Sequence, residues 1–233
     1  MSKQFVIVGG SHGIGHGIVN RLLRDGSSVT VLSRTTGDLD LSQPNLRHVV
    51  ADATSDLPDG AMPDSIDGLA YCPGSINLGP VRGVKPESLI DEFQLNVVGA
   101  IRCVQAALRP MKSSGGGSVV FFSTVAVQQG MPMHSSVAAV KGAIEGLTRS
   151  MAAELAPSIR VNAIAPALVD TPLAERLLSS DEKRAAMGKR HPLGRVGTVD
   201  DIAAAAHFLL TEQSSWVTGQ ILGIDGGLSS LKV

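Results

Sequence analysis

A lone lysine on the apolar face of a predicted helix is the first residue here whose position implies chemistry. The segment MHSSVAAVKGAIEGLTRSMAAEL spans residues 133–155, and its apolar side chains recur at steps of three and four, which predicts a helix. Lys141 falls on that stripe between Val137 and Ile144. Because an unpaired ammonium is costly to bury, we expect a neighbouring side chain or a bound group to meet it.

A histidine shares this face of the helix. His134 precedes Lys141 by seven residues, close to two full turns, so His134, Val137 and Lys141 lie on one side. Histidine titrates near neutrality and suits general acid–base work. A neutral ring next to an ammonium can still donate one N–H to a developing oxyanion. The alternative is that His134 only caps the start of the helix or lines a pocket, and the sequence leaves both open.

A glycine-rich turn near the N-terminus predicts a dinucleotide site. In VIVGGSHGIGHGI, Gly9, Gly13 and Gly15 follow an apolar strand and open a helix. Glycines at this spacing let the backbone turn tightly and approach a pyrophosphate, which the helix N-terminus attracts. The alternative is an ordinary glycine-rich turn between a strand and a helix.

The end of the second predicted strand indicates which dinucleotide is bound. NAD sites usually carry Asp or Glu there to hold the ribose 2′-hydroxyl. This chain has VLSRTTG, in which Ser33 is uncharged and Arg34 can fork onto a 2′-phosphate. His12, in the glycine-rich turn, is placed to add a further donor. A solvated surface charge is the alternative for Arg34, but the missing acid favours NADP(H).

Composition excludes several other classes of protein. The 233 residues are 43% apolar and carry a formal net charge of −1, which fits a globular protein and points to no nucleic-acid or membrane partner. The apolar run at the N-terminus is too short for a signal peptide. Cys72 and Cys103 suggest no disulfide framework or metal site. We therefore expect a cytoplasmic protein with two free thiols and no metal.

The predicted elements alternate along the chain and imply an α/β fold. Helices are expected from Ile14 to Asp25, from Pro86 to a stop at Pro110, over 133–155, as two short pieces near 173–190, and from Val199. Strands are expected at 4–10, 27–33, 46–52, 66–74, 115–124, 159–166 and 219–227. This order predicts one Rossmann-like domain over 1–233, a doubly wound parallel sheet of about seven strands with helices on both faces. The segment 34–45 is barely long enough for a crossover and has poor helical character, so its helix should be short or absent and the sheet edge near residues 35–65 thin.

Taken together, these motifs resemble the classical short-chain dehydrogenases/reductases over almost the whole chain. The matching features are the GxxxGxG spacing at Gly9–Gly15, Asp52 after the third strand, Asn96 in the long helix, IRVNAIAPALVDTP, HPLGRVGTVDDIA and VTGQILGIDGG. The resemblance implies an oxidoreductase with a small-molecule substrate and a substrate lid over about 168–197. It also implies a homodimer or homotetramer formed through the helices at 86–109 and 135–156.

The resemblance also assigns a cofactor site. Asp52 would contact the adenine, Val169 the carboxamide and Thr171 a phosphate, and YCPG at 71–74 stands where the family usually has Asn-Asn-Ala-Gly. The full set expected to bind the cofactor is Gly9, Ser11, His12, Gly13, Ile14, Gly15, Ser33, Arg34, Thr35, Asp52, Ala53, Cys72, Pro73, Gly74, Lys141, Pro166, Val169 and Thr171.

The chain departs from the family at the catalytic tyrosine. Lys141 matches the lysine of the Tyr-x-x-x-Lys motif, but Val137 stands at the tyrosine position. The only tyrosine, Tyr71, lies in the YCPG turn and is no substitute. Thr124, next to Ser123, stands at the position of the catalytic serine. Related enoyl reductases carry a tyrosine at the position of His134. The expected catalytic residues are therefore Asn96, Thr124, His134 and Lys141.

Three functions remain open on the sequence. One is an NADPH-dependent reductase of a conjugated C=C bond, in which the enolate oxygen needs a hydrogen bond rather than immediate protonation. Another is a carbonyl reductase or alcohol dehydrogenase that uses His134 or Thr124 as a substitute acid. The third is a protein that binds NADP(H) without redox chemistry. In the lid, Leu168, Leu173, Leu177 and Leu178 are expected to give apolar cover, with Arg176 and Arg190 either contacting an anion or facing water.

Overall fold

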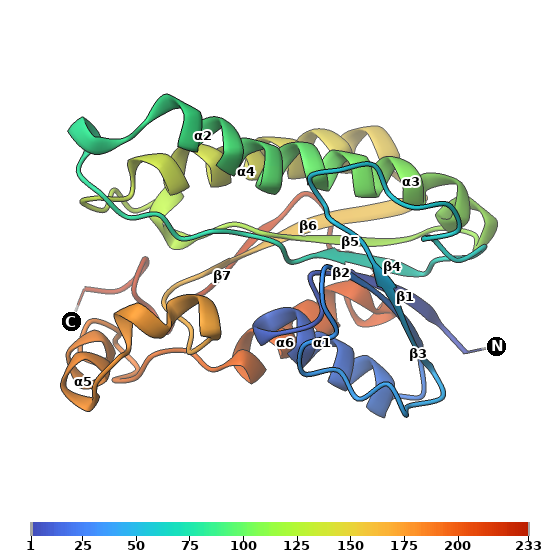
Figure 1. The fold of residues 1–233 in the computed structure, drawn as a ribbon, viewed down its shortest axis with the longest axis horizontal. Coiled ribbons are helices and arrows are strands. Elements are labelled where there is room, and N and C mark those ends of the chain that lie inside the picture. The colour runs from blue at the N-terminus through green and yellow to red at the C-terminus, as the bar shows by residue number, and fades with distance from the viewer. Residues whose placement is uncertain (1, 233) are drawn as a thin grey trace.

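The computed structural model describes residues 2–232 and contains a seven-stranded sheet in which every neighbouring pair is parallel (Figure 1). Its strand order is β3-β2-β1-β4-β5-β6-β7, so the order reverses between β1 and β4. The strands are β1 Gln4–Val8, β2 Ser28–Ser33, β3 Leu46–Val50, β4 Gly68–Tyr71, β5 Gly117–Phe122, β6 Ile159–Pro166 and β7 Ile221–Ile224. The predicted doubly wound, Rossmann-like sheet is confirmed, and ligands of such sheets bind outside the carboxyl ends of the strands at the reversal.

Helices cover both faces of the sheet (Figure 1). Two lie on one face, α1 Gly13–Arg24 and α6 Val199–Leu210. Three lie on the other, α2 Pro86–Phe93, α3 Gly99–Ser113 and α4 Ser135–Leu155. The chain between β6 and α6 holds a 3₁₀ turn, Pro172–Leu177, and the short helix α5 Asp181–Gly188, close to the two short helical pieces predicted there.

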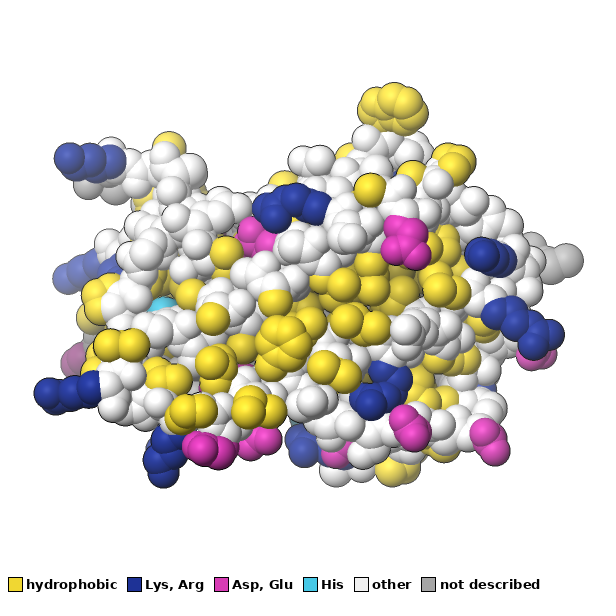
Figure 2. Space-filling model, turned by 90° about the horizontal axis from the view of Figure 1, so that it is seen from above, with side chains coloured by type: hydrophobic (Ala, Val, Ile, Leu, Met, Phe, Trp, Pro, Cys, Tyr) yellow, Lys and Arg dark blue, Asp and Glu magenta, His cyan; other side chains and the backbone are white. Residues whose placement is uncertain are grey.

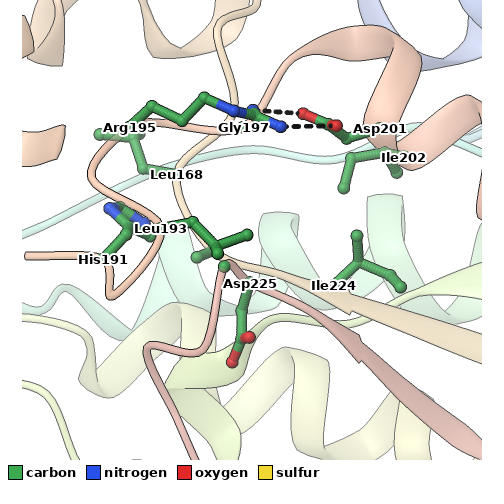
Figure 3. Close-up of a pocket in the computed structure, with 11 residues that line it drawn as sticks. Leu168, His191, Leu193, Arg195, Gly197, Asp201, Ile202, Ile224 and Asp225 are labelled. Atoms are coloured by element: carbon green, nitrogen blue, oxygen red, sulfur yellow. Dashed lines mark hydrogen bonds and ion pairs between the residues drawn. The ribbon is translucent and has the colours of Figure 1, made fainter. Parts of the chain in front are cut away.

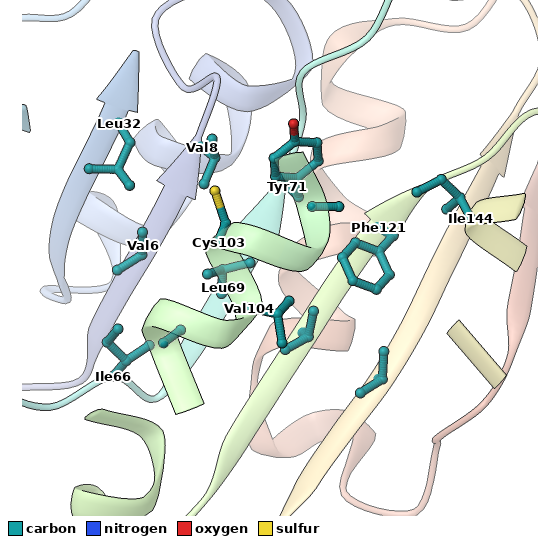
Figure 4. Close-up of a cluster of buried hydrophobic side chains, with 14 of the residues drawn as sticks. Val6, Val8, Leu32, Ile66, Leu69, Tyr71, Cys103, Val104, Phe121 and Ile144 are labelled. Atoms are coloured by element: carbon teal, nitrogen blue, oxygen red, sulfur yellow. The ribbon is translucent and has the colours of Figure 1, made fainter. Parts of the chain in front are cut away.

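Successive strand residues are buried on opposite faces, which gives the molecule two apolar cores. Val6 and Val8 of β1 pack under α3 and α4, whereas Phe5 and Ile7 pack against α1 and α6. Figure 4 shows the first core, where Leu69 and Phe121 from the sheet meet Cys103 and Val104 from α3 and Ile144 from α4. Because parallel strands are buried on both faces, they appear in the sequence as continuous apolar runs.

The long helix predicted from Pro86 to Pro110 differs from expectation in two ways. The prediction of a stop at Pro110 is wrong, because α3 runs on to Ser113. A proline in the last turn removes only its own N–H bond, and its carbonyl still accepts the N–H of Ser114 at 3.2 Å. The helix is also interrupted by a π-helical segment, Gln94–Val98, between α2 and α3. Wider turns of this kind occur often at functional sites.

The sheet edge is thin, as predicted. No helix lies between β2 and β3 in the described chain, and β3 is an edge strand whose Arg47 and Val50 are exposed. Cys72 and Cys103 are free thiols, as expected. Among residues 2–232, no helix combines the length and apolar character needed to cross a bilayer.

Candidate active site

The glycine-rich turn after β1 closes tightly on itself. Gly9 and Gly13 adopt φ values of +73° and +54°, a region that other residues rarely enter. A Cβ on Gly15 would strike the carbonyl oxygen of Gly9, so the third glycine lets the helix start directly over the turn. The N-terminus of α1 therefore points its free N–H groups at the space above the strand ends.

Two distant segments lie against this turn. A Cβ on Gly9 would be 3.1 Å from Pro73 Cδ, and one on Gly13 would be 3.6 Å from Thr171 Cβ. Pro73 follows β4 and Thr171 follows β6, so the fold brings the glycine turn, the YCPG segment and the 166–171 segment to one end of the sheet.

A cavity of about 290 Å³ opens at this end of the sheet. It contains three of the four predicted catalytic residues, Thr124, His134 and Lys141, together with Val137. Its other walls include the predicted cofactor residues Ile14, Cys72, Gly74, Pro166, Val169 and Thr171. The cavity thus joins the expected cofactor site to the helix face that carries the lysine.

Lys141 stands in this cavity as an uncompensated cation. Among residues 2–232, its Nζ has no hydrogen-bond or ion-pair partner. Burial disfavours the ammonium and lowers the pKa of Lys141 to about 8, an effect that the nearby Cys72 opposes only in part. Burial likewise raises the pKa of the Cys72 thiol to about 12, so Cys72 is not a thiolate that could pair with the lysine.

Asn96 is a second polar group whose position is set by the fold. It lies in the π-helical segment, donates its Nδ2–H to the carbonyl of Glu92 at 2.8 Å, and leaves its buried Oδ1 without a partner. A Cβ on Gly74 would be 3.4 Å from Lys141 Nζ and 3.5 Å from Asn96 Oδ1. The free donor of Lys141 and the free acceptor of Asn96 therefore face the same glycine.

Tyr71 has a structural role in this segment. It ends strand β4 rather than lying in a turn, and its buried hydroxyl donates to the carbonyl of Leu95 in the π-helical segment. Burial holds the pKa of Tyr71 well above its usual range. It does not line the cavity, so the expectation that it cannot replace the missing tyrosine agrees with its position.

A buried carboxylate fixes the start of α4. Glu92 accepts hydrogen bonds from Asn77 Nδ2 at 2.8 Å and from Ser136 Oγ at 2.9 Å. Ser136 directly precedes Val137, so these bonds hold the first turn of α4 against α2. Sequence reasoning did not find this cluster, because Glu92 looks like one more charge in a polar helix.

The two hydroxyls after β5 differ in what they can donate. Ser123 Oγ donates to the buried Glu145 at 2.8 Å and is therefore committed. Thr124 Oγ1 accepts the N–H of Ala126 at 3.3 Å, so its own O–H is free to donate into the cavity. The structure favours Thr124 over Ser123 as a donor to a bound oxygen.

The contact of His134 with Pro132 argues against the predicted donor role of its neutral ring. Its Nδ1 lies 2.7 Å from the carbonyl oxygen of Pro132, and a carbonyl can only accept, so Nδ1 carries the proton of a neutral ring. Nε2 is then an acceptor and cannot donate to an oxyanion. The capping alternative is not met either, since the side chain makes no hydrogen bond to the α4 backbone. His134 remains as part of the cavity wall.

The residues expected near the adenosine end lie around β2. Arg34 is exposed and has no hydrogen-bond or ion-pair partner within residues 2–232. The hydroxyl of Ser33 donates to the carbonyl of Thr35 at 2.8 Å. Ser33 therefore bears on the choice of cofactor through its lack of charge, because its hydroxyl is already used. His12 does not stand free as expected, because its Nδ1 lies 2.9 Å from Asp38.

The remaining predicted cofactor residues flank this end. Thr54, through its N–H and hydroxyl, holds the pKa of the Asp52 carboxyl below its usual value, and Arg34 adds to the effect. Ser11 is buried in the glycine turn, and Thr35, next to Arg34, is exposed. The carbonyl of Ala53 accepts a hydrogen bond from Arg102 Nη1 at 3.2 Å.

The segment 168–197 contributes apolar wall to the cavity. Leu168, Leu173 and Leu177 line it as predicted, and so does Arg190. Leu178 does not, because it packs with Ala174 and Val196 in a small separate core, and Arg176 is not among the lining residues. Sequence reasoning missed Ser75, Met187 and His191, which also line the cavity; none lies on a periodic stripe that would have marked it.

Comparisons with known proteins identify the family. A family model described as enoyl-(acyl carrier protein) reductase matches residues 8–229. L-xylulose reductase from Bos taurus is 34% identical over 235 residues, which cover 97% of this chain and 96% of that protein. The chain belongs to the short-chain dehydrogenase/reductase family. Val137 stands four residues before Lys141, the position at which the family motif is expected to carry its tyrosine.

Solved structures of this family agree with the fold. A short-chain dehydrogenase from Francisella tularensis superposes with a TM-score of 0.91 at 29% identity, covering 99% of this chain and all of that one. A gluconate 5-dehydrogenase from Burkholderia cenocepacia, solved with NADP and tartrate, superposes with a TM-score of 0.88 at 26% identity, covering 100% of this chain and 97% of that one.

Proposed function

We propose that this short-chain dehydrogenase/reductase is an NADPH-dependent reductase of conjugated C=C bonds. The observation that carries the proposal is the unpaired Lys141 in a cavity whose wall one helical turn away is Val137, a residue with no proton to give. In such a reduction the hydride adds to the β-carbon, and the negative charge develops on an enolate oxygen. That oxygen requires a positive potential and a hydrogen bond, rather than a proton delivered in the same step.

The residues present fit a bound NADP(H). The glycine turn closes tightly enough for the N-terminus of α1 to face the space above the strand ends, and Arg34 is free to pair with a 2′-phosphate. The related gluconate 5-dehydrogenase is solved with NADP. Bound NADPH would supply the hydride, Val169 and Pro166 would lie at its nicotinamide end, and Thr171 would contact a phosphate.

The chain's own residues then act on the substrate oxygen. Lys141 places its charge beside that oxygen, and the free O–H of Thr124 donates to it. Val137 makes the adjacent wall apolar and leaves no acid there. We treat residues 1–233 as one domain and residues 168–197 as the segment that covers a bound substrate from the side of Leu173 and Leu177.

Carbonyl reduction is the second candidate. With a pKa of about 8, the Lys141 ammonium can release a proton near neutral pH, so it could protonate an alkoxide directly. The curated relatives include the bovine L-xylulose reductase and a 3-oxoacyl-[acyl-carrier-protein] reductase, both named for reduction of carbonyl substrates.

A matched pair of substrates separates these candidates. NADPH oxidation is followed with cyclohexenone and with cyclohexanone, and the product of the first is identified by mass spectrometry and NMR. We expect turnover of the enone to the saturated ketone, and slower or no turnover of the ketone. Formation of the allylic alcohol would favour carbonyl reduction. No turnover of any enone or ketone would favour a protein that binds NADP(H) without redox chemistry.

Arg34→Ala should weaken NADPH binding by about one to two orders of magnitude, equivalent to about 1.5–3 kcal/mol for a charge-assisted contact. NADH lacks the 2′-phosphate and serves as the internal control, since its affinity should not change. Both affinities are measured by calorimetric titration of the wild type and the variant. Equal affinity of the wild type for NADPH and NADH would refute the assignment.

Thr124→Val should lower kcat on the enone by about 10-fold or more, because it removes the free hydroxyl donor that follows β5 without changing the side-chain shape. His134→Ala should leave kcat/KM within a factor of about three, since neutral His134 presents no donor to the cavity. The two variants are compared by steady-state kinetics with saturating NADPH. The opposite ranking would show that His134, as an imidazolium, is the working donor.

We also expect a homodimer or homotetramer that assembles through the helices at 86–109 and 135–156, which are α2, α3 and α4. On these helices Ala100 and Val140 are buried in the core of the chain and cannot contribute to an interface. Figure 2 views the face covered by α2, α3 and α4 and shows apolar side chains grouped among charged ones. On α2, Ile90 and Phe93 are 59% and 42% exposed. Light scattering should give a dimer or tetramer at micromolar concentration; a monomer would contradict the expectation.

A further inference from the structure

A buried histidine outside the predicted site leaves one ring nitrogen unpaired. His191 follows α5, is 5% exposed, and lines the same cavity as Lys141 and Thr124. Its Nδ1 lies 2.9 Å from the carbonyl oxygen of Met187. Its Nε2 is buried and has no partner within residues 2–232.

The contact with Met187 determines what the free nitrogen can do. A carbonyl only accepts, so Nδ1 carries the proton, and Nε2 of the neutral ring presents a lone pair. A buried acceptor without a donor loses its hydration and gains nothing in return. The structure around His191 is therefore complete only when a donor reaches Nε2.

The backbone holds the ring in this orientation. The N–H of His191 donates to the carbonyl of Gly188 at 3.0 Å, and the carbonyl of His191 accepts a hydrogen bond from the N–H of Gly194 at 2.8 Å. A Cβ on Gly226 would lie 3.5 Å from His191 Cβ and 3.7 Å from Cδ2, so the ring packs closely against that turn. Figure 3 shows a smaller pocket that His191 also lines, where it lies beside Leu168 and Leu193 and away from the Arg195–Asp201 ion pair.

Among residues 2–232, no donor lies within hydrogen-bond distance of His191 Nε2. Leu168, Met187 and Leu228 make this part of the wall apolar. Arg190 is exposed, and its Nη1 contacts Met187 Sδ at 3.7 Å. An acceptor in an apolar wall selects a ligand that carries an O–H at one point and hydrocarbon elsewhere.

We propose that His191 Nε2 accepts a hydrogen bond from a hydroxyl group of the substrate, so that the enzyme selects enones or ketones that carry a hydroxyl away from the reacting bond. This inference rests on the proposed reductase function and names its substrate class. His191 is then a specificity-determining residue, distinct from the lysine and threonine that meet the reacting oxygen.

Two substitutions of His191 distinguish the role of its Nε2 as an acceptor in the cavity from the role of its Nδ1 in the bond to Met187. The amide N–H of His191→Asn can replace the bond to Met187 but leaves no acceptor at the place of Nε2. The longer His191→Gln carries an oxygen that reaches that place. Cyclohexenone and a bicyclic enone are assayed at about pH 8, where an ordinary imidazole is neutral, each beside its ring-hydroxylated derivatives.

We expect the wild type to prefer at least one hydroxylated derivative over its parent by about 10- to 100-fold in kcat/KM. That preference should disappear in His191→Asn and persist in part in His191→Gln. A wild type without any preference, or a preference that survives in His191→Asn, would overturn the inference and indicate that water satisfies Nε2.

The failure of this inference is distinguishable from failure of the proposed function. Turnover of the parent enones without hydroxyl preference would leave the reductase function standing and remove the role of His191. If nothing is turned over, the same compounds are titrated calorimetrically into the NADP⁺-saturated protein. Tighter binding of a hydroxylated compound that is lost in His191→Asn would then support the His191 contact while the reductase function fails. No difference in that titration would overturn both.

Discussion

Lys141→Met should lower kcat on the enone by about 10²- to 10³-fold at saturating NADPH, the effect of removing one preorganised donor from a developing oxyanion. Methionine keeps the length of the side chain and its apolar stem but removes the charge. No other cation lines this part of the cavity among the described residues except the exposed Arg190, so nothing nearby can substitute for the ammonium. Single-turnover kinetics measure the loss independently of weakened cofactor binding.

The dependence on pH tests the same charge. Because the pKa of Lys141 is lowered to about 8, the ammonium is lost as pH rises through that value, and the reduction rate should fall there. Lys141→Arg keeps a charge whose pKa is far higher, so any activity that it retains should not fall in this range. A wild-type rate that stays constant across pH 7 to about 9.5 would contradict the role assigned to the ammonium.

A folding control follows from the sign of the pKa shift. The folded state binds the lysine proton less tightly than the unfolded state, so below about pH 8 the buried charge opposes folding. Lys141→Met removes that penalty, and the protein without cofactor should unfold at a higher temperature than the wild type. An inactive variant that is also less stable would indicate damage to the fold rather than lost chemistry.

The fold was predictable because the features that specify it are local in the sequence. The strands are short apolar runs, and the spacing of Gly9, Gly13 and Gly15 marks the glycine turn. The segment 34–45 is short and has poor helical character. The π-helical segment was not predictable, because it depends on the Tyr71 hydroxyl, which reaches Leu95 from another element. The same holds for Pro110, whose effect depends on how near it lies to the end of α3.

Residue types near the site were predictable, but their hydrogen-bond states were not. The helical spacing placed His134 and Lys141 in one cavity, as the structure shows. Only the structure shows that the carbonyl of Pro132 accepts a hydrogen bond from His134 Nδ1, and that the carbonyl of Met187 accepts one from His191 Nδ1. Pro132 lies in the irregular segment before α4 and Met187 in the last turn of α5, and neither contact follows from a periodic sequence pattern. Such contacts decide whether a histidine donates or accepts, and so decide its chemistry.

Val137→Tyr should create or raise ketone reduction by about 10²-fold or more, the usual contribution of a positioned general acid. Val137 is 8% exposed, lines the cavity, and precedes Lys141 by one turn of α4, so a phenol there would lie beside the ammonium. The positive charge would lower the pKa of that phenol and make it a better proton donor. The same ring fills space in the cavity, so enone reduction should not improve and is expected to fall.

Val137→Phe is the matched control, because it adds nearly the same bulk without the hydroxyl. Cyclohexanone and cyclohexenone are assayed with both variants at saturating NADPH. If the phenol acts as the acid, only Val137→Tyr gains ketone reduction, whereas both variants lose enone reduction to a similar extent. Equal ketone rates in the two variants would show that the missing tyrosine does not limit carbonyl reduction in this site. The native chemistry would then have to be sought in groups other than those beside Lys141.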